Sequence, residues 1–142
     1  MTHRRPIGAL VLVMAILVLA GCKQAGEPEG AGDPARVEPI HNSDVSRITL
    51  EPEAARRIDV RTAPVEQTGG RKRIPYSAVL YTADGDTFVY VSPRPLSYQR
   101  EAIEVDRIDG DSAILTKGPA AGVEVVVRAA QEVYGTEFGV DE

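Results

Sequence analysis

The sequence predicts a mostly β fold, a small antiparallel β-barrel or roll with one or two short helices, preceded by a signal peptide and a disordered linker. Three observations predict the fold. From residue 46 onward, short runs rich in β-branched and aromatic residues follow one another, glycine-containing turns separate several of them, and no stretch has the length and periodicity of a long helix. We therefore expect a signal peptide over 1–21, a linker region over 22–45 and one β domain over 46–142.

The first 21 residues have the parts of an export signal. Arg4 and Arg5 form a short positive segment, an apolar run without polar or charged side chains spans 7–20, and small residues end it. A membrane-spanning helix needs roughly 20 apolar residues, which is more than this run provides. Leu19, Ala20 and Gly21 end the expected signal, and Cys22 begins the next region.

These four residues resemble the lipobox of bacterial lipoproteins, and the resemblance implies that Cys22 is the site of lipid attachment. In that class the thiol receives a diacylglycerol, the signal is cut before the cysteine, and several acyl chains anchor the new N-terminus stably in the membrane. The implied location is extracytoplasmic, and Lys23 in place of an aspartate favours the outer membrane where the cell has one. The alternatives are an ordinary secretory signal with an incidental cysteine, or a free redox cysteine without an internal partner.

Removal of the signal would leave an acidic chain with few side chains that bind transition metals. Arg4 and Arg5 would be lost but no acid, so 14 basic residues would stand against 21 acidic ones, a net charge of −7. Both methionines would also be lost, and His41 would be the only histidine. Nucleic-acid binding is disfavoured because such proteins carry basic faces, and a copper-handling role lacks its ligands. We expect no metal and no cofactor.

Residues 23–44 are predicted to form a flexible linker. Glycines, prolines, alanines and acids dominate this stretch, and it has almost nothing to bury. His41, Asn42, Ser43 and Asp44 could be imagined as a ligand or catalytic cluster. Because a linker gives them no rigid support, we interpret them as a solvated turn.

Each element of the domain follows from a local pattern. Residues 47–50 form a β-rich run, and Pro52 suits the start of a helix over 53–57, where its missing N–H costs little. Apolar and polar residues alternate over 58–65, which is typical of a half-buried strand, and 67–70 reads as a turn. Further strands are expected over 74–82, 87–92, 98–108, 112–117 and 123–128, and a helical turn over 129–134.

Two Asp-Gly-Asp triplets, at 84–86 and 109–111, lie between pairs of expected strands. A calcium loop needs six or more spaced oxygen ligands, including a bidentate glutamate, and neither triplet supplies them. Asp-Gly is a favoured sequence of tight hairpin turns, so we expect two hairpins there. The domain sequence also has no phosphate-binding loop and no histidine to activate a serine or threonine, and we expect that it is not an enzyme.

Several segments of the domain, taken in order, resemble the opening and closing parts of periplasmic adaptor (membrane-fusion) proteins of resistance–nodulation–division (RND) efflux pumps. Each segment consists mostly of apolar and turn residues, so their order carries the resemblance, which extends over nearly all of 46–142. The segments are ITLEPEAA at 48–55, IDVRTAPVE at 58–66, IPYSAVL at 74–80, FVYV at 88–91, GPAAG at 118–122, VVV at 125–127 and AAQEVYG at 129–135.

The departure from that family limits what the resemblance implies. In the family, half of a barrel, a lipoyl domain and a long helical hairpin separate the opening and closing parts, whereas here residues 67–73 join them directly. The chain therefore resembles the membrane-proximal domain alone. A domain of about 100 residues has a radius of gyration of about 13 Å, which is too small to bridge to an outer-membrane channel.

The resemblance implies an accessory protein that contacts an RND transporter or a full-length adaptor. The alternative is a free-standing extracytoplasmic module that binds a ligand or a cell-wall component. An aromatic-lined groove would favour that alternative, but the tyrosines alternate with core positions and do not define one. These tyrosines are Tyr76, Tyr81, Tyr90 and Tyr98.

Arg71, Lys72 and Arg73, with three earlier arginines, form the only basic concentration of this acidic chain. The run is a candidate contact for a partner protein or for anionic lipid, where each cation near the surface contributes about 1 kcal/mol. The alternative is a solvated strand end whose charges protect an exposed sheet edge. The earlier arginines are Arg56, Arg57 and Arg61.

Overall fold

The computed structural model describes residues 33–139. The expected signal peptide, the lipobox with Cys22, and the linker up to residue 32 lie outside the described residues. Within them, the prediction of a mostly β, antiparallel, barrel-like fold with two short helices is confirmed. None of the helices between residues 33 and 139 combines the length and the apolar character that crossing a bilayer requires.

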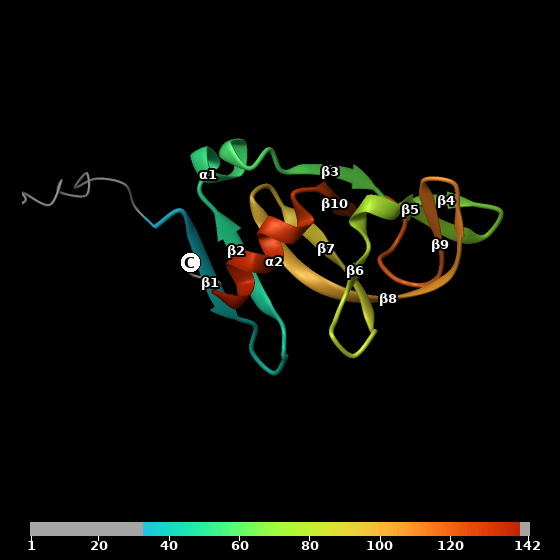
Figure 1. The fold of residues 1–142 in the computed structure, drawn as a ribbon, viewed down its shortest axis with the longest axis horizontal. Helices are drawn as coiled ribbons and strands as arrows, with labels where there is room; N and C mark the ends of the chain where they lie inside the picture. The colour runs from blue at the N-terminus through green and yellow to red at the C-terminus, as the bar shows by residue number, and fades with distance from the viewer. Residues whose placement is uncertain (1–32, 140–142) are drawn as a thin grey trace, which may run out of the picture. The chain divides into compact units, whose positions relative to one another are not determined.

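The described chain contains ten strands, two α-helices and one 3-10 turn, shown in Figure 1. The strands are β1 (Ala35–Pro39), β2 (Ser46–Leu50), β3 (Arg61–Pro64), β4 (Glu66–Thr68), β5 (Arg71–Pro75), β6 (Leu80–Tyr81), β7 (Thr87–Arg94), β8 (Ser97–Asp109), β9 (Ser112–Lys117) and β10 (Glu124–Arg128). The helices are α1 (Pro52–Arg57) and α2 (Ala130–Phe138), and η1 (Tyr76–Ala78) is the 3-10 turn.

All strand pairs are antiparallel, and the main path of the sheet runs β3-β10-β7-β8-β9-β5-β4. Its first and last strands, β3 and β4, are consecutive in the chain and separated only by Val65. The backbone N–H of Val65 donates to the carbonyl of Val123 at 2.8 Å, and its side chain is buried. The sheet therefore curls until its two ends nearly meet, which produces the barrel.

Strands β7 and β10 are buried on both faces because they separate two hydrophobic cores. On β7, Phe88 and Tyr90 face the first core while Val89 and Val91 face the second, as expected when side chains alternate along a strand. We call the first the helix-side core, which includes Ile48, Leu50, Phe88, Tyr90, Tyr98, Val126 and Val133. The second is the barrel core, which includes Val65, Ile74, Val89, Val91, Ile103, Leu115 and Val125.

Strand β8 is long enough to serve both halves of the sheet. Its first residues pair with β2 and β7, and its last residues pair with β9. The register with β9 shifts around Val105, so that Val105 and Arg107 pair with the adjacent residues Leu115 and Ile114. Such bulges bend a strand and change the direction of its side chains, and here they let β8 turn from one part of the sheet into the other (Figure 1).

A buried ion pair fastens α2 to the sheet. Glu137, whose side chain is only 2% exposed, accepts hydrogen bonds from the Tyr90 hydroxyl at 2.5 Å and from Arg100 Nε at 2.9 Å. The Arg100 guanidinium also lies 5.1 Å from the ring centre of Phe138 and 5.7 Å from that of Phe88. Burial, reinforced by the hydrogen bond to Glu137, raises the pKa of the Tyr90 phenol above its ordinary range, so the phenol stays a donor.

The expected linker over 22–45 is wrong in its last part. Residues 35–39 form β1, which pairs with β2 in the register Ala35↔Leu50 to Pro39↔Ser46. The turn between them closes through the Ile40 N–H, which donates to the Val45 carbonyl at 3.1 Å. Most β1 side chains are exposed, so the strand is held by main-chain hydrogen bonds, which a search for burial in the sequence does not detect.

Other boundaries differ for local reasons. The strand expected over 58–65 begins only at Arg61, because Ile58 caps α1 and Asp59 has a positive φ of 52°. The run expected over 74–82 is interrupted by η1 after Pro75. The turn expected over 67–70 consists of Gly69 and Gly70 alone, at φ 58° and 77°, joining β4 to β5 as a two-residue hairpin loop.

Candidate functional site

The basic run 71–73 belongs to β5, which lies inside the sheet between β9 and β4. The interpretation of this run as a protected sheet edge is therefore wrong, because β4 occupies the end of that path. Alternation along β5 separates the three cations. The Lys72 ammonium donates to the carbonyl of Gly118 on the side of the barrel core, whereas Arg71 and Arg73 belong to the opposite, outer face.

Register brings a third cation, Arg107, to this outer face. Ile114 on β9 pairs with Arg73 of β5 on one side and with Arg107 of β8 on the other. Ile114 is 7% exposed and lies beneath the two arginines, while its neighbours on β9 face the barrel core. Arg107 is far from Arg73 in the sequence, so only the strand order places both over one residue.

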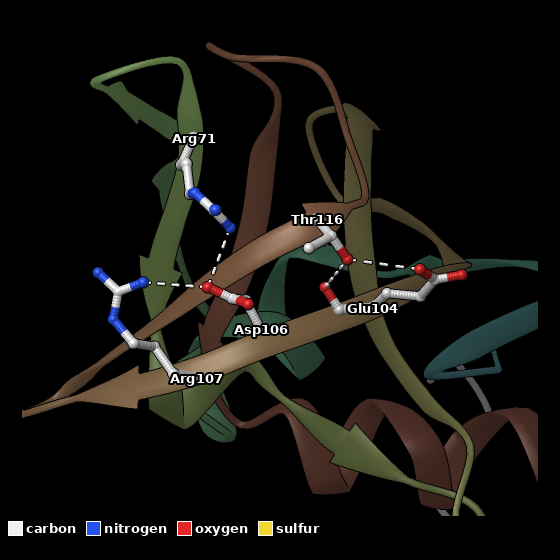
Figure 2. Close-up of polar contacts among 5 residues, drawn as sticks. All are labelled: Arg71, Glu104, Asp106, Arg107 and Thr116. Carbon is white, nitrogen blue, oxygen red and sulfur yellow. Dashed lines mark hydrogen bonds and ion pairs between the residues drawn. The ribbon is translucent and has the colours of Figure 1, made fainter.

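Asp106 holds two of the arginines together, as Figure 2 shows. It lies in the bulge of β8 and has no register partner on β9. Arg71 Nη1 and Arg107 Nη1 lie 2.9 and 3.0 Å from the same oxygen, Asp106 Oδ2. Because all three side chains are at least one-third exposed, we expect these ion pairs to contribute little to stability and to serve mainly to orient the guanidinium groups.

The arginines surround a surface hollow of about 280 Å³. We call this the arginine hollow, and it is bounded by strands β4, β5, β8 and β9 around the β4–β5 turn. Arg73 has no ion-pair partner within the described part of the chain, although Glu66 pairs with it in register. The hollow is lined by Thr68, Gly69, Arg71, Arg73, Arg107, Asp109 and Ile114.

A polar cluster adjoins the arginines on β8 and β9. Thr116 Oγ1 lies 3.4 Å from both the carbonyl oxygen and Oε2 of Glu104 (Figure 2). Lys117 Nζ lies 2.5 Å from Glu104 Oε1. The hydrogen bond from Lys117, with a smaller one from Thr116, holds the pKa of Glu104 below its ordinary value. This acid therefore stays ionised and is already paired with a cation of its own hairpin.

The structure does not bring the earlier arginines to the hollow. Arg56 and Arg57 belong to α1 and Arg61 begins β3, and Figure 1 places α1 and β5 toward opposite ends of this part of the molecule. Arg61 instead donates to Asp59 at 2.8 Å, and this hydrogen bond holds the pKa of the Asp59 carboxyl below its ordinary value, helped by Arg128. These cations form a separate surface group.

The tyrosines also separate into two kinds. Tyr90 and Tyr98 are buried in the helix-side core, whereas Tyr76 and Tyr81 are 41% and 54% exposed. The two exposed hydroxyls lie 3.3 Å apart, and this contact raises the pKa of Tyr81. The expected turn at 41–44 is present, with Asn42 at a φ of 59°.

A second hollow, of about 740 Å³, lies between α1 and α2. Its floor includes Leu50 of β2, and Arg57 and Glu132 stand at its walls. Its volume falls in the range of roughly 300 to 1,000 Å³ that small-molecule sites occupy. The remaining lining residues are Asp33, Pro34, Ala35, Ala54, Ile58, Gln131, Gly135, Thr136 and Gly139.

Sequence reasoning found part of the arginine hollow and missed the rest. The sequence predicts that Arg71 and Arg73 act together with Lys72. In the structure, Lys72 lies on the other face of β5, and Arg107 and Asp106 are the residues that join the two arginines at the hollow. Because successive side chains of a strand point to opposite faces, the sequence could have placed Lys72 on the face opposite Arg71 and Arg73. No sequence signal places Arg107 and Arg73 on either side of Ile114, since that requires the pairing of three strands and the position of a bulge.

In comparisons with known proteins, no family model, no curated protein and no solved structure matches the chain.

Proposed function

We propose that this chain is a lipid-anchored extracytoplasmic accessory protein, similar to an isolated adaptor domain, that acts by contact with an RND-type efflux transporter or a full-length adaptor. The observation that carries the proposal is the ordered set of adaptor-like segments from 48–55 to 129–135. The lipobox residues ending at Cys22 supply the anchor, and the role requires no catalysis.

The arrangement of the strands supports this proposal. The opening segment contributes β3 and the closing segments contribute β10, and these strands pair directly from Pro64↔Glu124 to Arg61↔Arg128. The same closing part continues into α2, whose Val133 packs in one core with Ile48 and Leu50 of β2. The opening and closing parts of the described domain therefore lie side by side, as the resemblance to an adaptor domain without its long insert implies.

The anchor is tested by mass spectrometry of the mature protein from cells. We expect an N-terminal peptide that begins at acylated Cys22, and we expect Cys22→Ala to leave an unprocessed precursor. A mature N-terminus at another residue, without acyl mass, would contradict the anchor.

The partner is tested by crosslinking in intact cells. We expect the wild-type chain to capture a transporter or a full-length adaptor, and we expect Arg71→Glu and Arg73→Glu to weaken this capture if the arginine hollow lies at the contact. Arg94→Glu is a matched control, because Arg94 is an exposed arginine at the far end of β7. Capture of no transport protein by the wild-type chain would contradict the proposed role.

The hollow between α1 and α2 favours a second candidate, a free-standing module that binds an apolar ligand. Its volume of about 740 Å³ suits a small molecule, and its walls are mainly apolar. Extraction of the purified chain with organic solvent, followed by mass spectrometry, tests this role. A stoichiometric ligand that is lost in a Gly135→Leu variant would favour the module over the transport partner.

A further inference from the structure

We infer that the arginine hollow binds the phosphate group of an anionic membrane lipid and so fixes which face of the domain lies against the bilayer. The inference rests on the membrane anchoring in the proposed function and adds a ligand and a site to it. The residues that carry it are Arg71, Arg73 and Arg107, with Ile114 beneath them.

The chemistry of the lining suits a phosphate. Guanidinium groups are planar forks of N–H donors that match phosphate oxygens, and three of them surround one hollow of about 280 Å³. Asp106 occupies one N–H of Arg71 and one of Arg107, and it holds both groups at the same oxygen while leaving their other donors available. Arg73 forms no ion pair among residues 33–139. Asp109 also lines the hollow, so three arginines stand against the two acids Asp106 and Asp109, which leaves one net positive charge.

The charge of the rest of the chain favours a lipid as the source of that phosphate. A mature chain of net charge −7 is repelled by an anionic bilayer on most of its faces. A chain tethered at the same bilayer would therefore settle with its cationic hollow toward the lipid, where each cation near the surface strengthens attraction about fivefold. A free phosphate ion could bind the same guanidinium groups, but it lacks the negative surface potential of the bilayer that attracts the whole cationic face.

The test is hydrogen exchange of the full mature lipoprotein in nanodiscs, followed by peptide mass spectrometry. Neutral phosphatidylcholine discs are compared with discs that contain phosphatidylglycerol. We expect peptides covering β4 to β5 and the end of β8 to exchange about fivefold more slowly in the anionic discs. Arg73→Gln together with Arg107→Gln should abolish this difference, and the exposed control Arg94→Gln should leave it intact.

Three results would overturn the inference. The first is equal exchange of these peptides in the two kinds of disc. The second is equal protection by millimolar inorganic phosphate in neutral discs, which would make the hollow a site for free anions. The third is protection that appears only when a captured transport protein is present, which would assign the hollow to an acidic protein surface.

The same peptide map separates this inference from the proposed function. The acyl mass on the peptide that begins at Cys22 reports the anchor independently of exchange at the hollow. An acylated, transporter-bound chain without lipid-dependent protection would refute the lipid site alone. An unacylated chain would refute the anchor on which both depend.

Discussion

Replacing Arg100 by methionine should be among the most damaging single changes in the helix-side half of the domain. The substitution keeps a long apolar side chain against Phe88 and Phe138 but removes the cation that neutralises Glu137. Glu137 lies in the last turn of α2, where a negative charge opposes the helix dipole. Its position is therefore explained by the pair with Arg100 and not by the stability of the helix itself.

The magnitude follows from the burial of the two partners. Removing one member of a buried ion pair typically costs about 3 to 5 kcal/mol, because the other charge stays buried without compensation. The Glu137 side chain is 2% exposed and would keep only the Tyr90 hydroxyl as donor, so little water can replace Arg100. A further loss of about 0.5 to 1 kcal/mol is expected from the contact of the guanidinium with the aromatic rings.

The assay is urea unfolding of the detergent-solubilised chain, with free energies compared between variants. We expect Arg100→Met to lose about 3.5 to 6 kcal/mol and the exposed control Arg94→Met to change by less than about 0.5 kcal/mol. The double variant Arg100→Met/Glu137→Met should be more stable than Arg100→Met alone, because it removes the orphaned carboxylate. A double variant as unstable as the sum of the two single variants would refute this account.

Three further predictions concern the barrel half and its turns. Burial raises the pKa of Glu101 above its ordinary value of 4.5, against the opposing effect of Lys72, so this carboxyl loses stabilisation as pH rises through its folded pKa. Glu101→Gln should therefore be more stable than wild type at pH 7, and urea titrations should show the gap closing below pH 4.5. Gly118→Ala would place a Cβ 3.0 Å from Leu115 Cδ1 and 3.1 Å from Ile103 Cγ2 at a φ of 153°, so it should lose about 1 to 3 kcal/mol. Gly110→Ala would meet only the strain of its φ of 59°, with open space around the new Cβ, and should lose less. Chelator should not change the melting temperature, since no three acidic, histidine or cysteine residues gather among residues 33–139, and a lowered value would revive the Asp-Gly-Asp turns as calcium sites.

The fold class was predictable because its signals are local. Strand β7 and the hairpin of β8 and β9 follow from β-branched runs and an Asp-Gly turn, and both lie close to their expected bounds. Strand β1 was not predictable in the same way, since its side chains are mostly exposed and its stability comes from pairing with β2. A strand held by its backbone carries almost no hydrophobic signature in the sequence.

The candidate site was only half visible for a related reason. The sequence groups Arg71, Lys72 and Arg73 because they are adjacent, but a strand sends adjacent side chains to opposite faces. Arg107 joins the site through the order of strands β8, β9 and β5, and Asp106 joins it through a bulge. Neither the order nor the bulge follows from the residues of one strand alone.

The residues expected to stabilise the fold and those expected to bind lipid lie in different halves of the domain. The unfolding experiment and the lipid-binding experiment are therefore independent. The Arg100–Glu137 pair is largely buried and contacts Tyr90 and Phe88 of the helix-side core, so its loss should appear in unfolding. The side chains of Arg71 and Arg107 are more than half exposed and lie outside the barrel core, so their replacement should leave unfolding nearly unchanged. A variant of the arginine hollow that loses lipid-dependent protection while keeping its unfolding free energy would therefore report binding and not damage to the fold.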